Sequence, residues 1–565
     1  MIIIENSKSL EISENPNLSG ETSELHIIMQ FFIHKSDIRN NEIKLCLQKN
    51  HNNNNITKIH LLNEQIYSDK ELGLQSTDKI HQENIGKRLS FQDVFAYIRK
   101  NNLKGYFVLI NADIFLDDSI QYIKTSTMHE KKQMCALLRF EYDPEIPSLD
   151  DAKLFGPRAD SQDTWIFHSN FLLKQEQEKC FAFNFGQPGC DNKMIYLMRV
   201  LGYQIFNDPH VIKTYHYHLS QERDYTIKDL VNNPWGLINP HNVNLNTIAR
   251  FSANMNPMTQ IYQYTKGFTE TVFDDNKLLY DYIRTQNVLG KHFIIPRICG
   301  IENNFAVFGK FFKETGNKNV QQYFDDVRPA MKNNAGIKMS SNESILKYSE
   351  MYLKAFENAE MFCGWEIYGD YIRHISDSHG FMKQLHATKT MAWAFALDIF
   401  HYIYDTPWTQ ALQGKRVLII SAFEESIREK IAIRSTLYDG VDLFPDCEFV
   451  FIKPPMTQSD ESSREFDVEL AEFTDRLDII KDDYDIALVS CGGYGNLVCN
   501  HIFEKHQKSS IYVGGVLQMY FGIVGARWYK ERPDIVRMFM NENWSRPKQS
   551  ERPLGCEKVE GGCYW

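Results

Sequence analysis

Residues 105–120 read GYFVLINADIFLDDSI, and this hydrophobic stretch ends abruptly in polar residues and acids. Asn111 and Asp113 directly follow the apolar run, with one small residue between them. In an open parallel sheet, ligands bind at the carboxyl ends of the strands, and a carboxylate there can hold a divalent cation against a phosphate group. The common alternative is a strand that ends in a turn-forming Asn and a helix-capping Asp, and the triplet by itself favours this alternative.

Four further residues could share this chemistry. Asp163 ends a polar loop directly before the apolar segment TWIFH, and Asp191 opens a helical segment after a loop rich in Gly and Pro. His216 and His218 close the segment IFNDPHVIKTYHYH. One such histidine is more often structural than a ligand, and two at this spacing also fit alternate faces of an edge strand.

Alternating strand and helix patterns must position these residues. Ser90 predicts a helix N-cap before the segment FQDVFAYIRKNN. Strand–helix–strand–helix–strand order within about ninety residues is the signature of a parallel α/β sheet. The expected strands are 24–34, 56–64, 105–113 and 133–142, and the expected helices are 39–50 and 90–102.

The second half of the chain repeats the α/β pattern after a stretch rich in Asn and Pro. We expect a linker at 226–275 and a flexible N-terminal arm at 1–23. The expected strands of the second half are 292–300, 415–423, 447–455, 485–493 and 509–515, with a helix at 342–360. The fold class is therefore α/β, with two Rossmann-like domains at 24–225 and 276–565.

Composition limits the classes of partner. A length of 565 residues predicts more than one domain, and the net charge of −11 argues against nucleic acid as a partner. The 11 cysteines are an odd, scattered set, which favours reduced thiols and a cytoplasmic location. No apolar run has the length of a membrane span, and the N-terminus lacks the features of a signal peptide.

The order of motifs in the first half resembles a known family. The strand with its NAD triplet, the DSQDTW loop, the GQPGCDN helix start and the terminal HYH resemble nucleotide-sugar glycosyltransferases of the GT-A fold, particularly those of large DNA viruses. The resemblance covers residues 25–220 and implies a mixed sheet with helices on both faces. It implies that Asn111 and Asp113 stand where the family binds a metal–diphosphate, with Asp113 as direct ligand of Mn²⁺ or Mg²⁺. His216 or His218 would be a further ligand.

Such a transferase needs a base if it inverts the sugar's configuration, because a carboxylate must then take the proton of the acceptor hydroxyl. Asp191 is the first candidate, and Asp163 is the second or orients the acceptor. We expect the helix N-terminus to keep Asp191 ionised and to weaken its basicity slightly. A helix N-cap is the structural alternative for Asp191, and a retaining enzyme would need no such base.

Two motifs of the second half also suggest a ligand site. Gly492, Gly493 and Gly495 lie between a strand and a helix, where they could approach a phosphate or form an ordinary tight turn. The segment RICGIE resembles the RxGDGE pattern of GT-D glycosyltransferases, although Gly300 stands in place of the Asp. The resemblance implies that Arg297 binds a diphosphate and that Glu302 serves a metal or the acceptor.

Together these patterns predict a bifunctional glycosyltransferase, GT-A-like and then GT-D-like. It would use a nucleotide-sugar donor, with UDP-sugars favoured, and a glycan acceptor, in the cytoplasm, or in the host cytoplasm or virion if viral. One alternative is a single active N-terminal transferase with a C-terminal nucleotide- or glycan-binding domain. A nucleotidyltransferase is a second alternative, although the segment FFIHKSDIRNNE lacks the Gly-rich loop of that class. A glycan-binding module without catalysis is the third.

Overall fold

The computed structural model divides the chain into two compact units, Met1–Tyr264 and Thr265–Trp565. The described residues are 23–146, 148–220, 225–232, 235–238, 240, 262–264, 268–270, 272–365, 373–401, 403–460, 462–552 and 564–565. The predicted arm, except Ser23, and much of the predicted linker lie outside them. Two short strands fall in the linker range, β12 (Tyr262–Tyr264) at the end of the first unit and β13 (Phe268–Glu270) near the start of the second.

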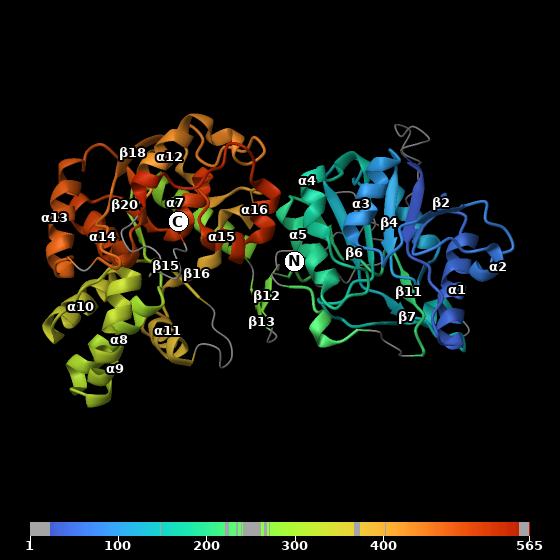
Figure 1. Ribbon diagram of the computed structural model, residues 1–565, viewed down its shortest axis with the longest axis horizontal. Helices are drawn as coiled ribbons and strands as arrows, with labels where there is room; N and C mark the ends of the chain where they lie inside the picture. The colour runs from blue at the N-terminus through green and yellow to red at the C-terminus, as the bar shows by residue number, and fades with distance from the viewer. Residues whose placement is uncertain are drawn as a thin grey trace, which may run out of the picture. The chain divides into compact units, whose positions relative to one another are not determined.

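The first unit is built on a mixed seven-stranded sheet with the order β10-β6-β9-β4-β1-β2-β3 (Figure 1). Strands β4, β1, β2 and β3 are parallel, whereas β9 runs antiparallel between β4 and β6. The strands are β1 (Leu25–Met29), β2 (Lys58–Asn63), β3 (Ile80–Asn84), β4 (Tyr106–Ile110), β6 (Gln133–Leu137), β9 (Thr164–His168) and β10 (Gln204–Phe206). The sequence did not predict β3, because its residues IHQEN are mostly polar and only partly buried.

Helices cover both faces of this sheet. Ile43 of helix α1 packs in one cluster with Val108 of β4, whereas Phe95 of helix α3 contacts Phe167 of β9 on the opposite face, beside Phe107. Ser90 caps α3 in a capping box with Asp93, as the sequence predicts. The described helices of this unit are α1 (Asp37–Asn52), α2 (Asp69–Leu72), α3 (Phe91–Lys100), α4 (Gln175–Glu178) and α5 (Cys190–Val200).

A second, small sheet brings distant segments to the end of β4. Its order is β5-β11-β7-β8, with β5 (Ile114–Leu116), β7 (Phe140–Glu141), β8 (Lys153–Leu154) and β11 (Thr214–His216). In the antiparallel β11–β5 pair, His216 lies opposite Ile114, the residue that follows Asp113. In the parallel β11–β7 pair, His216 lies opposite Glu141. This register places His216 beside two acidic residues that are far from it in the sequence.

The second unit contains a fully parallel five-stranded sheet with the order β14-β20-β19-β17-β18. These strands are β14 (Ile294–Ile295), β17 (Arg416–Ser421), β18 (Glu448–Ile452), β19 (Ile486–Ser490) and β20 (Ser509–Tyr512). A separate parallel pair joins β15 (Met361–Gly364) to β16 (Thr390–Trp393). The described helices are α7 (Val272–Val288), α8 (Ile301–Thr315), α9 (Lys318–Ala330), α10 (Asn342–Asn358), α11 (Arg373–Leu385), α12 (Glu424–Lys430), α13 (Phe466–Ile479), α14 (Gly495–His501), α15 (Ala526–Glu531) and α16 (Pro533–Phe539).

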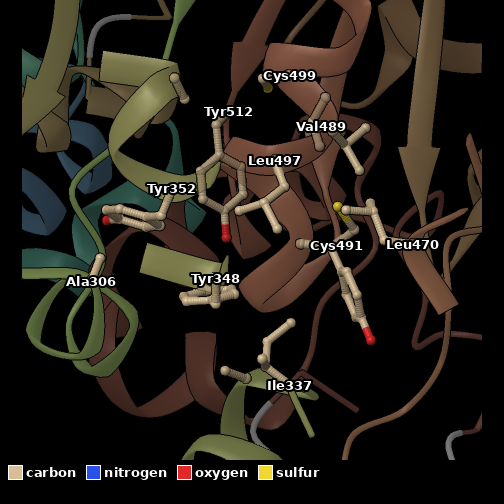
Figure 2. Packing of buried hydrophobic residues seen from close by; sticks show 14 of the residues in the cluster. Ala306, Ile337, Tyr348, Tyr352, Leu470, Val489, Cys491, Leu497, Cys499 and Tyr512 are labelled. Atoms are coloured by element: carbon tan, nitrogen blue, oxygen red, sulfur yellow. The ribbon is translucent and has the colours of Figure 1, made fainter. Parts of the chain in front are cut away.

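A core cluster of the second unit joins this sheet to helices α8, α10, α13 and α14 (Figure 2). Tyr348 and Tyr352 of α10 pack against Leu497 of α14 and Val489 of β19. Tyr512 closes the cluster at the end of β20 and donates a hydrogen bond to the Gly492 carbonyl at 2.7 Å. The described residues form a mixed α/β structure with two sheets rich in parallel pairs, and none of the described helices is both long and apolar enough to span a membrane.

Candidate functional site

A cavity of about 720 Å³ opens at the carboxyl end of β4 in the first unit. The loops after β4 and before β9 and the start of α5 form much of its wall. All six candidate residues that the sequence suggests for this half line it, namely Asn111, Asp113, Asp163, Asp191, His216 and His218. The site therefore lies at the carboxyl end of a central strand, which is where open α/β sheets bind ligands.

Asp113 and both histidines form a compact cluster. The Oδ2 atom of Asp113 lies 3.3 Å from Nε2 of His216 and 3.8 Å from Nδ1 of His218. One ligand atom from each of the three residues lies within 4.8 Å of the others. Two imidazole nitrogens and a carboxylate oxygen are a donor set that fits a divalent first-row metal ion. The geometry brings both histidines to Asp113, so the choice between them that the sequence left open is not required.

Arg39 of α1 also belongs to this cluster, although the sequence gave no sign of it. Its guanidinium contacts Oδ2 of Asp113 at 2.6 Å and Oε2 of Glu42 at 2.9 Å. Burial raises the pKa of Asp113, but the charges of His216 and Arg39 outweigh burial and hold this pKa far below its usual range. Asp113 is therefore a buried but ionised carboxylate, and a carboxylate must be ionised to bind a metal.

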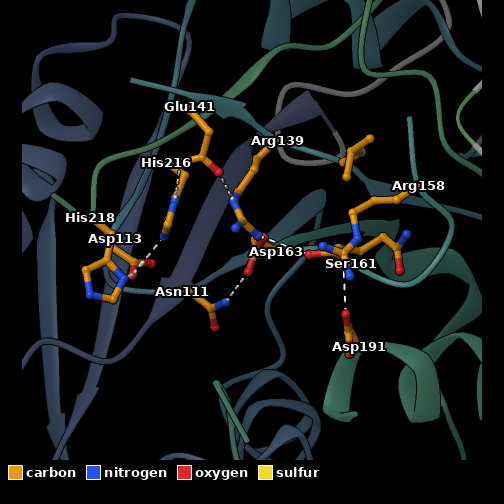
Figure 3. A network of polar contacts seen from close by, with 12 residues as sticks. Asn111, Asp113, Arg139, Glu141, Arg158, Ser161, Asp163, Asp191, His216 and His218 are labelled. Atoms are coloured by element: carbon orange, nitrogen blue, oxygen red, sulfur yellow. Dashed lines mark hydrogen bonds and ion pairs between the residues drawn. The ribbon is translucent and has the colours of Figure 1, made fainter. Parts of the chain in front are cut away.

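Glu141 and Arg139 connect this cluster to the middle of the cavity (Figure 3). Nδ1 of His216 donates to Oε2 of Glu141 at 2.9 Å, which fixes the ring with Nε2 toward Asp113. Arg139 binds the other Glu141 oxygen at 2.9 Å and forms an ion pair with Asp163. Burial lowers the pKa of His216, but Asp113 and Glu141 outweigh it and raise this pKa to about 9.

Arg139 and Glu141 were not among the residues expected from the sequence, although a signal for them was present. Both residues follow a buried strand, in QMCALLRFEY, just as Asn111 and Asp113 follow β4. The sequence therefore showed a charged pair just after another strand of the same sheet. The expected strand at 133–142 instead absorbed both residues, whereas β6 ends at Leu137.

Asp163 is held in one orientation by two neighbours. Asn111 donates from Nδ2 to Oδ1 of Asp163 at 2.8 Å, and Arg139 contacts Oδ2. Asn111 thus orients Asp163, which lies between the Asp113 cluster and Asp191 in Figure 3. Both carboxylate oxygens of Asp163 carry a strong partner, which suits a positioning role better than proton transfer.

Asp191 lies in the first turn of α5, and the N-cap position is Gly189, so the capping alternative does not apply. The backbone N–H of Gln162 donates to Oδ2 of Asp191 at 3.2 Å. Burial and the nearby Asp163 charge raise the pKa of Asp191 to about 7. The helix N-terminus was expected to keep Asp191 ionised and to weaken its basicity slightly; the pKa is instead raised, because desolvation and a like charge outweigh the helix dipole.

Two ion-paired arginines, Arg139 and Arg158, lie beside these acids in the cavity wall. The guanidinium groups of Arg139 and Arg158 lie 4.1 and 4.8 Å from the centre of the Phe155 ring. Arg158 also binds Asp160 through two hydrogen bonds of 2.7 and 3.0 Å. The cavity therefore combines carboxylates, imidazoles and fixed cations, an arrangement that can hold a metal ion together with an anionic ligand.

A second cavity, of about 530 Å³, lies at the carboxyl ends of β17, β19 and β20 in the second unit. Arg297, Glu302 and Gly492 line it, as does Gly514. Arg297 donates to the Val513 carbonyl at 2.7 Å and lies 5.2 Å from the Trp365 ring, but its Nε atom is buried without a hydrogen-bond partner. Within the described part of the chain, no carboxylate forms an ion pair with this arginine.

Gly493 and Gly495 do not line that cavity, in contrast to the role expected for them. A Cβ atom at Gly493 would lie 2.4 Å from the Ile337 side chain, and one at Gly495 would lie 2.2 Å from the Tyr512 ring. Close packing in the core accounts for these two glycines. Gly492 differs because it lines the cavity and has a φ of +55°.

No family model and no curated protein matches this chain. One solved structure with partial similarity is the mannosyltransferase PcManGT from Pyrobaculum calidifontis in complex with GDP-Man and Mn²⁺. The identity is 10% and the TM-score 0.25, over 39% of this chain and 62% of the other. This chain thus spans less than two thirds of that structure, and similarity this low carries no argument about fold or activity.

Proposed function

We propose that the first unit is a glycosyltransferase that moves a sugar from a nucleotide-diphosphate donor with a divalent metal. The observation that carries the proposal is the cluster of Asp113, His216 and His218 in one cavity with Asp191, whose pKa is about 7. A bound divalent ion would offset negative charge on the departing diphosphate. Asp113 would supply the carboxylate ligand and the two histidines the nitrogen ligands.

The ligand set favours Mn²⁺ over Mg²⁺. Mg²⁺ prefers oxygen ligands in a strict octahedral shell, whereas two of the three ligand atoms here are imidazole nitrogens. The Glu141 hydrogen bond would hold His216 in the orientation that binding requires. Mn²⁺ is therefore the metal to test first.

Asp191 is the proposed general base of an inverting transfer. The acceptor oxygen would bond to the anomeric carbon as the bond from that carbon to the diphosphate breaks, and Asp191 would take the hydroxyl proton. A carboxylate with a pKa near neutrality is well matched to this task. Asp163, held by Asn111 and Arg139, would orient the acceptor glycan.

The second unit is proposed to contain a second nucleotide-sugar site, and a second transfer reaction there would make the enzyme bifunctional. Support comes from Arg297, a cation in the wall of the second cavity with a buried N–H that lacks a partner. A diphosphate would supply the missing acceptor and the counter-charge. A domain that binds a nucleotide or glycan without catalysis would use the same contact, so turnover separates the two cases.

Binding assays on the full chain test both sites. UDP-sugars come first, followed by GDP- and dTDP-sugars, each with and without Mn²⁺. The first site predicts metal-dependent donor binding that Asp113→Asn removes and Arg297→Gln leaves in place. If the second site exists, a separate donor-binding event should be removed by Arg297→Gln and left in place by Asp113→Asn. Donor binding that neither substitution changes would reject both assignments.

A further inference from the structure

A second group of metal-ligand side chains lies in the second unit, outside both cavities. The Nε2 atoms of His501 and His506 each lie 2.7 Å from the same oxygen, Oδ1 of Asp478. The ring of His506 is almost inaccessible, with 1% of its side chain exposed, whereas 48% of Asp478 is exposed. The three side chains thus converge on one point that solvent reaches from the Asp478 side.

The backbone is shaped to make this convergence possible. Asp478 lies in the last turn of α13, and His501 ends α14 (Figure 1). The segment Ile502–His506 continues as a π-helix. Five residues along an α-helix point about 140° apart, so His501 and His506 would not share a face of one. The wider π turn brings them together, and such turns occur frequently at functional sites.

A buried tyrosine supports one of the two rings. The Tyr484 hydroxyl lies 2.6 Å from Nδ1 of His506, and the Tyr484 side chain is fully buried. With a metal on Nε2, the Nδ1 proton would be donated to the tyrosine oxygen. Partners of this kind fix ring orientation in metal sites and commonly raise metal affinity.

The cluster lies at the amino ends of the strands, whereas the second cavity lies at their carboxyl ends. Tyr484 comes two residues before β19, whereas Gly492, in the cavity wall, comes two residues after it. Helix α14 likewise begins at Gly495, close in sequence to the cavity residue Gly492, and ends at His501. A ligand at this cluster would therefore be remote from any chemistry in the cavity, and would join the end of α13 to the end of α14.

We propose that Asp478, His501 and His506 form a binding site for a first-row divalent metal ion, of which zinc is the representative. Two imidazole nitrogens and one carboxylate oxygen are ligands that zinc accepts at about 2.0–2.2 Å, with the remaining position open to water. Bound metal would stabilise the second unit, because only the folded chain brings the three ligands together.

The test uses the full chain stripped of metal with a chelator. Zinc equivalents are counted by competition with a chromophoric chelator, and thermal unfolding is followed with and without zinc. In the wild type, zinc should raise the melting temperature by about 4 °C or more. His501→Gln should bind one zinc equivalent fewer and should not show this rise. Tyr484→Phe should keep the equivalent but bind zinc about 10–100-fold more weakly.

Two controls separate this site from others. His51→Gln removes the ring of the His51–Asp78 ion pair, in which Asp78 is exposed and which belongs to no cluster of three metal-binding side chains among the described residues, so this variant should bind zinc as the wild type does. His218→Gln should remove a different equivalent, and the double variant with His501→Gln should lose both. If His218→Gln has no effect while His501→Gln does, the function proposed for the first unit fails and the present inference stands.

Equal zinc binding by the wild type, His501→Gln and His51→Gln would overturn the inference, because the three residues would then be an ion-paired cluster only. If His501→Gln does not fold without metal, Tyr484→Phe decides the matter, since Phe keeps the ring volume of a fully buried residue. Unchanged zinc affinity in Tyr484→Phe would then count against the site.

Discussion

The Nε2 atom of His216 lies 3.3 Å from Oδ2 of Asp113, in a buried setting. The two residues meet because β11 pairs antiparallel with β5, which begins immediately after Asp113. This contact joins the end of the central strand β4 to β11 of the small sheet. It gives the proposed metal site its geometry.

Asp113→Asn should reduce Mn²⁺-dependent donor hydrolysis at least about 100-fold, because a metal ion contributes several kcal/mol to such a reaction. Asn preserves the shape of the side chain beside Arg39. The assay is release of nucleoside diphosphate at saturating donor. Asp118→Asn is the matched control, since Asp118 is exposed and does not line the cavity. Wild-type turnover in Asp113→Asn would remove this residue from the site.

Glu141→Gln should weaken Mn²⁺ binding about 10–100-fold, because the hydrogen bond that orients His216 changes while the three ligands remain. At saturating metal, most of the turnover should return. The measurement is the Mn²⁺ concentration for half-maximal activity, with exposed Glu145→Gln as control. An identical metal dependence in both variants would contradict the supporting role of Glu141.

Asp191→Asn should lower turnover about 10²–10⁴-fold, since an amide cannot accept the hydroxyl proton. In the wild type, the rate should fall as the pH drops through about 7, because the protonated carboxyl is inactive as a base. Turnover is measured between pH 5 and 9, with exposed Asp150→Asn as control. A retaining enzyme would give a different result, with activity largely kept in Asp191→Asn.

The same carboxyl should also affect stability. The pKa of Asp191 is raised from 3.8 to about 7, so the folded chain holds a proton that the unfolded chain releases between these values. Its contribution to stability is therefore present at low pH and is lost as the pH rises through about 7. Asp191→Asn should melt at a higher temperature than the wild type at pH 8, with a smaller difference at pH 5. An equal difference at both pH values would contradict the raised pKa.

Gly495→Ala should destabilise the second unit by about 1–3 kcal/mol, because the added Cβ would lie 2.2 Å from the buried Tyr512 ring. Urea denaturation measures this loss. Gly380→Ala in α11 is the control, since nothing lies within 4 Å of its Cβ, and Ala favours a helix. Unchanged stability together with lost nucleotide binding would instead support a ligand role for Gly495.

Local sequence patterns predicted the elements of this chain better than its contacts. The apolar run at Tyr106–Ile110 and the Ser90 cap depend on neighbouring residues, and both are present as expected. The antiparallel position of β9, and the polar strand β3, depend on which strands lie beside them. The expected strand at 292–300 shortens to Ile294–Ile295 for the same reason, because only two residues pair with β20.

The candidate site divides in the same way. Asp113, His216 and His218 stand in motifs with recognisable spacing, so the sequence suggested them. Arg39 reaches Asp113 from a helix 74 residues away in the chain, a contact that no local pattern encodes. The raised pKa of Asp191 likewise comes from burial and from Asp163, which only the folded structure brings near.

The most direct test of the central claim is donor binding by the full chain, measured by calorimetry with and without Mn²⁺, for the wild type and Asp113→Asn. A nucleotide-diphosphate sugar should bind the wild type with metal-dependent affinity, and Asp113→Asn should lose this dependence. Donor affinity that is the same with and without metal in both proteins would contradict the claim.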